Sequence, residues 1–374
     1  EITNIVKIVC QLNSALNPKM KYILQRLGVS TYHVQSGRTE VYRERKAYFG
    51  LTTKMMIEDD LNTIFSFYIP KEYEDRVLKG IAINLNLNIA GFGSIWSEKV
   101  SIIGGEKFIN KDLNFETFLE LSAKTDFIVS KNLVAIDIIV QRGLSSDIIK
   151  AVLDWGYCVP CMTYGIGTGF RNTIGILRIT IPAEKEIIRV IVPKSESEDV
   201  MNHLIDVGKL DKPGKGFISM YSINMGVIDT KIFRGKSLSA ASIEQVIAAI
   251  DGIKGNDEWR KKENFHIVDV NLERKFLTEI SNISIFNDEG YFEQLVEKAM
   301  ENGASGATTI KGRFISDKEE TKDISPSRER SDFVLGESAK DSVISAIVED
   351  EIFSKTANGF IEEKKLIKAC TYLG

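Results

Sequence analysis

One segment of the chain has the residue types and spacing of an anion-binding loop. It reads Gly208-Lys209-Leu210-Asp211-Lys212-Pro213-Gly214-Lys215-Gly216-Phe217-Ile218. Glycines let backbone N–H groups approach an anion closely, and a lysine adds a mobile positive charge. Gly214, Lys215 and Gly216 meet both requirements, with Lys209 and Lys212 nearby. Because a tight turn before a strand needs glycine in any case, a purely structural role is the alternative.

A second segment, Trp155 to Cys161, has the Cys-x-x-Cys spacing of a thioredoxin redox motif. In such a motif a strand precedes the cysteines and a helix follows, and the helix N-terminus lowers the pKa of the reactive thiol. Here a helix pattern precedes Cys158 and Cys161, and a strand pattern follows them. We therefore expect two small apolar residues at a helix–strand junction rather than a redox centre.

Patterns for other chemistry are weak. The histidines, His33, His203 and His266, lie far apart and show no zinc-ligand spacing. The run Gly165 to Gly169 is not a dinucleotide fingerprint, because a strand pattern and not a helix follows it. No Ser–His–acid set stands out. We expect no catalytic residue, no metal and no required cofactor.

Composition narrows the class of protein. The chain has 374 residues, 43% of them hydrophobic, with a net charge of −4. This size suits two or three domains, and the charge gives no basic field for nucleic acid. No apolar run approaches the roughly 20 residues of a membrane helix, and we expect no secretory leader. Four cysteines in this length fit a reducing compartment, so we expect a cytoplasmic protein.

Glycines recur at fixed spacing and divide the chain into three copies of one unit. Pairs nine residues apart are Gly28/Gly37, Gly156/Gly165 and Gly303/Gly312. Strand-like runs then end at Pro70, Pro193 and Gly336, and 23 residues further on stand Gly93, Gly216 and Gly359. Self-similarity of this kind predicts one small domain written three times.

Each copy has the pattern strand, helix, strand, strand, helix, strand. The opening strands are predicted at Ile5–Val9, Val134–Val140 and Ile283–Phe286. Right-handed crossovers turn a βαββαβ order into a ferredoxin-like plait, with four antiparallel strands and two helices on one face. We predict an α+β fold of three such tandem domains, at 1–110, 131–235 and 278–374. Residues 111–130 form a linker, and 236–277 form a helical, charged linker.

Within this frame, the loop from Gly208 to Ile218 resembles the phosphate-binding B-loop of the nitrogen-regulatory PII and PII-like signalling proteins. That family folds as the same plait and forms homotrimers, with ligands in clefts between neighbouring subunits. The resemblance implies that three linked copies act as a pseudo-trimer in a monomeric chain. Three equal partners can close a heterologous ring, and covalent linkage raises their effective concentration.

The resemblance also implies ligand-binding residues. In copy two they are Lys209, Lys212, Gly214, Lys215 and Gly216; copy one offers Gly91 and Gly93, and copy three Lys355, Thr356 and Gly359. The turn that opens the family's T-loop is matched by Gly37 and Arg38, by Gly165, Gly167, Gly169 and Arg171, and by Arg313. Tyr48 matches a T-loop tyrosine that the family can modify covalently. Only copy two keeps both the glycine pair and lysine.

The function implied by the resemblance is non-catalytic signalling in nitrogen regulation. The effector would be a small anion, most plausibly ATP, ADP, AMP or a cyclic di-nucleotide, and T-loops would act on a partner protein. Two alternatives stay open. One is a structural or interaction scaffold with degenerate ligand sites. The other is a metal-binding trimer resembling CutA-like proteins, against which the scarcity of histidine counts.

Overall fold

The computed structural model describes the whole chain except residues 47–52, 116–128, 157, 170–183, 230–273 and 374. The mixed α/β class is confirmed, with more strand than helix. Tyr48, Arg171 and the helix predicted in the second linker lie outside the described residues.

Three groups of six elements follow one another in the predicted order. Unit 1 comprises β1 (Ile2–Asn13), α1 (Asn17–Leu27), β2 (Thr31–Lys46), β3 (Thr53–Pro70), α2 (Glu74–Leu85) and β4 (Gly93–Ile103). Unit 2 comprises β5 (Leu133–Gln141), α3 (Ser146–Trp155), β6 (Cys161–Gly169), β7 (Glu184–Pro193), α4 (Ser197–Gly208) and β8 (Gly216–Ile223). Unit 3 comprises β10 (Ile280–Asp288), α6 (Phe292–Glu301), β11 (Gly306–Ser316), β12 (Ser327–Gly336), α7 (Glu337–Val348) and β13 (Phe360–Lys365). Two short strands, β9 (Met225–Val227) and β14 (Lys368–Thr371), follow units 2 and 3.

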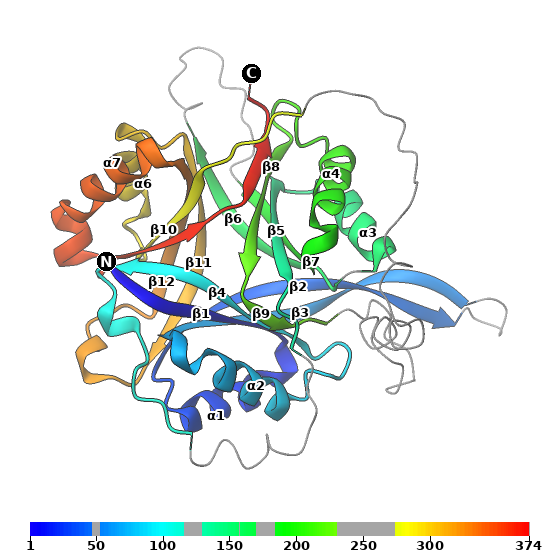
Figure 1. Ribbon diagram of the computed structural model, residues 1–374, viewed down its shortest axis with the longest axis horizontal. Coiled ribbons are helices and arrows are strands. Elements are labelled where there is room, and N and C mark those ends of the chain that lie inside the picture. The colour runs from blue at the N-terminus through cyan, green and yellow to red at the C-terminus, as the bar shows by residue number, and fades with distance from the viewer. Residues whose placement is uncertain (47–52, 116–128, 157, 170–183, 230–273, 374) are drawn as a thin grey trace.

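The strand order is the same in each unit. It runs β2-β3-β1-β4, β6-β7-β5-β8 and β11-β12-β10-β13, with antiparallel neighbours throughout. Figure 1 shows the three helix pairs at the periphery and the strands toward the middle. The sheets therefore face one another, and each buries its outer face under its own helices.

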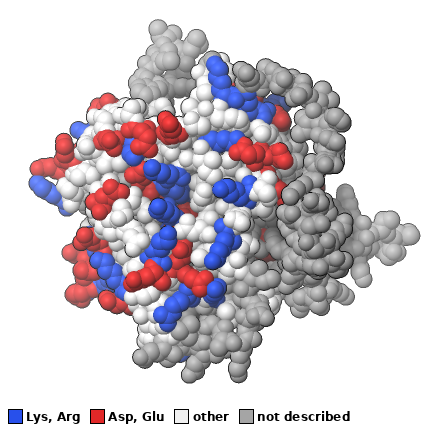
Figure 2. Space-filling view, in the orientation of Figure 1, with Lys and Arg blue, Asp and Glu red and all other residues white. Residues whose placement is uncertain are grey.

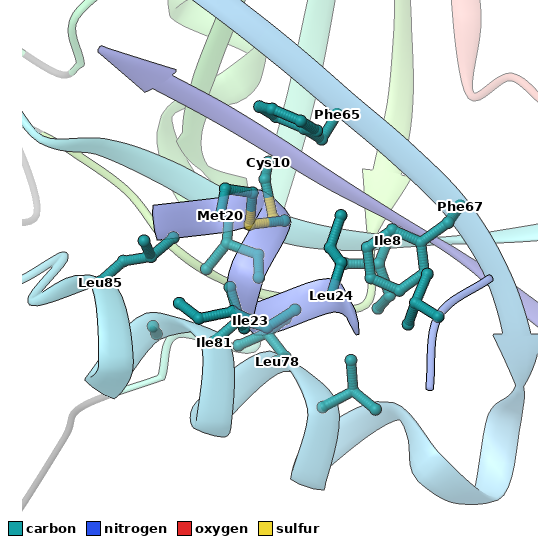
Figure 3. Packing of buried hydrophobic residues seen from close by; sticks show 14 of the residues in the cluster. Ile8, Cys10, Met20, Ile23, Leu24, Phe65, Phe67, Leu78, Ile81 and Leu85 are labelled. Atoms are coloured by element: carbon teal, nitrogen blue, oxygen red, sulfur yellow. The ribbon is translucent and has the colours of Figure 1, made fainter. Parts of the chain in front are cut away.

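Amphipathic helices account for the core of each unit. In unit 1, Met20 and Leu24 lie four residues apart on α1, which places them on one face of the helix. They pack with Ile81 of α2 against Ile8 of β1 and Phe67 of β3, and all five side chains are fully buried (Figure 3). In unit 3 the helix equivalent to α2 is α7, and it buries its apolar face less completely, because Val348 is 40% exposed.

The first glycine of each pair ends a helix, as its position predicts. Gly28 and Gly156 are left-handed C-caps, with φ of 79° and 75°. Unit 3 differs: Asn302 is the C-cap, and Gly303 follows it with φ 113°. All three glycines have positive φ, which explains the residue type.

The second glycine of each pair lies where two units meet. The second strands β2, β6 and β11 pair with one another. A Cβ added at Gly37, Gly165 or Gly312 would lie 3.2, 3.0 or 3.2 Å from the carbonyl oxygen of Met162, Thr309 or Val34, respectively. Unit 1 thus meets unit 2, unit 2 meets unit 3, and unit 3 meets unit 1.

A second cycle of contacts involves the last strands. Ile95, Ile218 and Ile361 each lie two residues after the landmark glycine of their unit. They pair with Val227 of β9, Cys370 of β14 and Ile103 of β4, respectively. The end of each unit therefore lies against the last strand of another unit. Together the two cycles join every unit to both others within this one chain.

Candidate ligand-binding site

A cavity of about 1020 Å³ lies between the three sheets and is lined by strands of all three units. Ligand pockets usually measure roughly 300–1,000 Å³, so this space is large enough for a drug-sized molecule. Seven Lys and Arg side chains and five Asp and Glu side chains contribute to its wall. The wall therefore carries charges of both signs, although the cavity lies inside the fold.

Three buried side chains meet where the last strands converge. Glu98, Tyr221 and Lys364 each stand five residues after the landmark glycine of their unit. Lys364 Nζ donates to Glu98 Oε2 at 3.0 Å, and the Tyr221 hydroxyl donates to Glu98 Oε1 at 3.3 Å. The Lys364 ammonium also lies 3.5 Å from the centroid of the Tyr221 ring. Burial acts to raise the pKa of Glu98, but Lys364 and nearby cations hold it well below its usual range.

A second buried pair joins units 1 and 3. Lys7 Nζ lies 2.9 Å from Glu362 Oε2, and the Tyr68 hydroxyl donates to the same oxygen at 2.5 Å. Burial opposes ionisation of Glu362, yet Lys7 and Lys364 hold its pKa below the ordinary value. Breaking such a pair leaves one buried charge uncompensated, so these contacts fix how the units fit together.

The loop before the last strand has the same backbone conformation in units 1 and 2. The φ angles are 56°, 78° and 130° at Asn86, Gly91 and Gly93, and 50°, 71° and 153° at Lys209, Gly214 and Gly216. Both loops also contain the same backbone hydrogen bond to the left-handed cap residue. Ile89 N–H donates to Asn86 O, and Lys212 N–H donates to Lys209 O, each at 2.9 Å. What one loop can bind is therefore informative about the other.

In unit 1 this loop holds a carboxylate of the same chain. Gly91 N–H donates to Asp229 Oδ2 at 2.6 Å, and Asp229 N–H donates to Ser94 Oγ at 2.8 Å. Asp229 is only 7% exposed and follows β9, so it comes from the end of unit 2. The loop conformation thus binds an anionic group in this protein, through a backbone amide.

At the loop of unit 2, the residue equivalent to Asp229 is Tyr372. Asp229 lies two residues after Val227, and Tyr372 lies two residues after Cys370, which has the same pairing register. Tyr372 is 47% exposed and lines the cavity beside Gly214 and Gly216. Nothing lies within 4 Å of a Cβ added at Gly214. The Cβ side of Gly214 is therefore open, whereas the counterpart Gly91 binds Asp229 through its amide.

Strands β6 and β7 complete this side of the cavity. Gly167, Thr168 and Gly169 line it together with Lys185. A Cβ added at Gly167 would overlap the Lys185 side chain, so glycine gives that lysine room. Lys185 is equivalent to Arg328 of unit 3, because each lies eight residues before the last residue of its strand, Pro193 or Gly336. A cation on this strand thus recurs in two of the three units.

Of the residues predicted for copy two, only the glycines Gly214, Gly216, Gly167 and Gly169 line the cavity. The three lysines are exposed and lie away from its wall: Lys209 is the left-handed cap of α4, Lys212 lies 3.7 Å from Asp211, and Lys215 follows them in the turn. Gly165 lies at the junction of the second strands. The backbone of the loop, rather than its lysines, faces the cavity.

The residues predicted in the other copies lie elsewhere. Gly37 is at the strand junction, and Arg38 is exposed, 3.0 Å from Asp59. Arg313 is exposed and pairs with Val34 in the sheet. Gly91 and Gly93 belong to the loop that holds Asp229. Lys355 and Thr356 are exposed on the turn Ile352–Thr356, where Lys355 pairs with Glu351, and Gly359 packs against Phe353.

The loop of unit 3 is also engaged from within the chain. Arg328 Nη2 donates to Asn358 O at 2.9 Å, and Lys107 Nζ donates to Asn358 Oδ1 at 3.2 Å. The sequence did not predict Arg328 and Lys107, nor Asp229, Tyr372 and Lys185, because none of them lies near a loop motif in sequence. The signal that could have found them is the repeat register, extended beyond the last strand of each unit.

The cysteine pair has the surroundings of a structural element. Cys158 lies in the segment after α3 and Cys161 is the first residue of β6, and both thiols are buried. Burial raises the pKa of Cys161 to about 12, so its thiolate is scarce at neutral pH. Cys158 Sγ accepts a hydrogen bond from Ile191 N–H at 3.3 Å. This environment favours packing over thiol chemistry.

The outer surface gives a weaker indication of ligand charge than the cavity does. On the face in Figure 2, Lys and Arg side chains are interspersed with Asp and Glu side chains over the described residues. None of the helices in the described ranges is long and apolar enough to cross a membrane. Ligand chemistry must therefore be inferred from the cavity wall.

No family model and no curated protein matches the chain. A solved GlnK–ATP complex from B. subtilis is 16% identical over 26% of this chain and 86% of that chain, with a TM-score of 0.22. An aspartate kinase from Synechocystis is 10% identical over 63% of this chain and 44% of that chain, with a TM-score of 0.20. With such low TM-scores, the interpretation of the site has to come from its own geometry.

Proposed function

We propose that this chain is a non-catalytic regulatory protein of the PII-like type, folded as an intramolecular pseudo-trimer. Two cycles of contacts support the ring: the junction of β2, β6 and β11, and the pairing of each unit's end with another unit's last strand. The buried pairs Lys7–Glu362 and Lys364–Glu98 also cross between units. A ring that closes on itself leaves no unit without a neighbour, which favours a monomeric chain.

The effector that we propose is an adenine nucleotide, bound where the unit 2 loop and the end of unit 3 line the cavity. The observation that carries this proposal is Asp229 on the unit 1 loop. Its carboxylate accepts a hydrogen bond from Gly91 N–H at 2.6 Å, and the equivalent residue Gly214 lies in the cavity wall. A phosphate would use that amide in the same way, since backbone N–H groups in turns bind anions.

The surrounding side chains suit the rest of a nucleotide. Lys185 lines the wall next to the glycines of β6 and supplies a cation for a phosphate chain. Tyr372 presents a half-exposed ring, on which a base can stack. Because stacking tolerates every base, adenine is the weaker part of this proposal and the phosphate the stronger.

Signalling to a partner protein would use the hairpins beyond the second strands. Leu61 of β3 is 71% exposed, and Ile57, Tyr164 and Ile166 are also exposed apolar side chains on β3 and β6. Apolar side chains exposed close together are common in protein–protein contacts. We infer that ligand binding against β6 changes the surface formed by these exposed side chains, and that a partner protein recognises this change.

Titration calorimetry with ATP, ADP, AMP and cyclic di-nucleotides tests the proposal, with Gly214→Asp and Gly214→Asn as a matched pair. Both side chains tolerate left-handed backbone, and they differ mainly in charge. We expect about one site per chain in the wild type, near-normal binding in Gly214→Asn, and at least tenfold weaker binding in Gly214→Asp. Equal affinity in the two variants, or no heat from any nucleotide with folded wild type, would contradict it.

A scaffold without a ligand is the second candidate. It is favoured by the loops of units 1 and 3, which are engaged by Asp229 and by Arg328 with Lys107. If it is correct, the wild type binds none of the nucleotides, and Lys215→Ala changes no measurable property. Any saturable nucleotide binding that Gly214→Asp abolishes rules out the scaffold.

A further inference from the structure

A second polar region of the cavity lies on the wall shared by units 1 and 3. It is formed by His33 of β2, Phe286 of β10 and Arg328 of β12, which all line the cavity. The His33 ring lies 5.2 Å from the Phe286 ring and 6.2 Å from the Phe108 ring, centroid to centroid. Lys7 Nζ lies 5.6 Å from the centroid of Phe286, and the Arg328 guanidinium 5.6 Å from that of Phe108.

Two nitrogen atoms in this region have no hydrogen-bond partner among the described residues. They are His33 Nε2 and Arg328 Nε, and both are buried. The Arg328 side chain is 2% exposed, and its two terminal nitrogens are used: Nη1 binds Asp288, and Nη2 donates to Asn358 O. A buried donor without a partner costs free energy, so a water molecule or a ligand atom belongs at each of these two positions.

The charge around His33 is positive. Burial lowers the pKa of His33, and Arg328, Lys7 and Arg330 lower it further. Each of these cations has its own carboxylate: Asp288 for Arg328, Glu362 for Lys7 and Asp332 for Arg330. The positive potential at His33 therefore comes from the closeness of these paired cations and not from unpaired charge, so an anion here depends on hydrogen bonds for its binding.

We propose that this wall, formed by His33 and Arg328 with Lys7 and Arg330 around them, is a binding site for a small oxyanion, either an organic carboxylate or phosphate. Arg328 Nε–H donates to one oxygen of the anion. His33, with its proton on Nε2, donates to the same group. The aromatic rings of Phe286 and Phe108 exclude water and strengthen both hydrogen bonds. The site is independent of the unit 2 loop, which belongs to a different pair of units.

Nitrogen-15 NMR of the imidazoles tests this proposal in the full-length protein, with succinate and inorganic phosphate as probes and sodium chloride at equal ionic strength as the reference. We expect a saturable shift of the His33 signals with one or both probes and none with chloride. A bound anion favours the imidazolium, so the pKa of His33 rises toward its ordinary value. A shift with succinate alone identifies a carboxylate site, and one with phosphate alone a phosphate site.

Variants separate this site from its surroundings. We expect His33→Phe, which suits the aromatic cluster, to weaken binding about tenfold or more. Lys311→Gln is the control: Lys311 also lines the cavity but is exposed and bound to Glu289, and we expect its loss to change affinity less than twofold. Gly214→Asp should leave succinate and phosphate binding at this wall unchanged, even where it abolishes nucleotide binding.

Two results would overturn the proposal. The first is an absence of any His33 shift at tens of millimolar of either probe in folded protein. The second is equal affinity of the wild type and His33→Phe. Arg328→Lys tests the guanidinium, and its anion affinity is interpreted only if circular dichroism shows the wild-type fold. If this variant does not fold, the NMR titration of the wild type and the affinity of His33→Phe test the proposal without it.

Discussion

Glu98 and Lys364 stand at equivalent positions of units 1 and 3, and they bind each other at 3.0 Å in the middle of the molecule. The third equivalent position is Tyr221, which contacts both. A homotrimer of any one unit would place three identical side chains here, and three buried carboxylates or three buried ammonium groups would repel one another. Different residues at this point require three different copies, which a single chain supplies.

Replacing Lys364 by methionine should destabilise the protein strongly. Glu98 would keep its charge in a buried position without its main partner, and breaking a buried pair costs about 3–5 kcal/mol. Urea unfolding followed by tryptophan fluorescence measures the change. Lys355→Met is the control, because Lys355 pairs with Glu351 on the surface and should matter little.

Exchanging the two charges should recover much of that loss. The double variant Glu98→Lys/Lys364→Glu keeps the ion pair and the contact with Tyr221, whereas each single change puts two like charges together. In the same urea assay we expect the double variant to be more stable than either single variant. Additive losses would show that the two side chains do not interact.

Stability should fall in mildly acidic solution because of His33. Its pKa in the folded protein lies below the ordinary value of 6.5, so its contribution is fully present above pH 6.5 and is lost as the pH falls toward the folded pKa. Between pH 6.5 and 5 this amounts to about 2 kcal/mol if the ring stays neutral throughout. Unfolding free energies at both values measure the loss, and His33→Phe should show a smaller one. An identical loss in the variant would assign it to other groups.

Asp229→Asn should loosen the loop of unit 1 without affecting that of unit 2. The amide oxygen is a weaker acceptor than the carboxylate, so the Gly91 hydrogen bond loses its charge-assisted part, about 1 kcal/mol. Hydrogen exchange should become faster at the Gly91 amide and stay unchanged around Gly214. Asp59→Asn, which removes an exposed partner of Arg38, serves as the comparison. Unchanged exchange at Gly91 would mean that Asp229 does not hold this loop.

Gly216→Ala and Gly214→Ala should differ in cost although the residues are two apart. A Cβ at Gly216 would overlap Ile139 O, with φ at 153°, so strand β8 has to shift. A Cβ at Gly214 meets nothing within 4 Å, so only the cost of left-handed backbone remains, about 1 kcal/mol. Thermal unfolding of both variants checks this. Equal losses would contradict the loop geometry.

The repeat was predictable from sequence because its glycines have local causes. Gly28 and Gly156 end helices with left-handed backbone, which few other residues adopt. Local cues are ambiguous where neighbouring segments compete: Asn17-Pro18 has the sequence of an N-cap followed by proline at the first helical position, but Asn17 is the first residue of α1, since a turn capped by Asn13 precedes it. Unit 3 also departs from the pattern of glycine C-caps, because Asn302 is the C-cap of α6 and Gly303 follows it.

The site was predictable only in part, because its partners come from distant segments. The glycines of the unit 2 loop form a local motif, whereas Asp229 reaches Gly91 across 138 residues of chain. The three lysines near that motif suggested the charge of the site, yet none of them lines the cavity. Among the cations that line the wall, Lys185 and Arg328 lie on β7 and β12, the third strands of units 2 and 3. Sequence alone gives no reason to select them.

Native mass spectrometry with ATP tests the central claim most directly, because it reports the ring and the ligand together. We predict a single chain of 41.9 kDa that carries one nucleotide, with the nucleotide retained in Gly214→Asn and lost in Gly214→Asp. A stable trimer of chains would contradict closure of the ring within one chain. A monomer that carries no nucleotide at saturating ATP would contradict the proposed site.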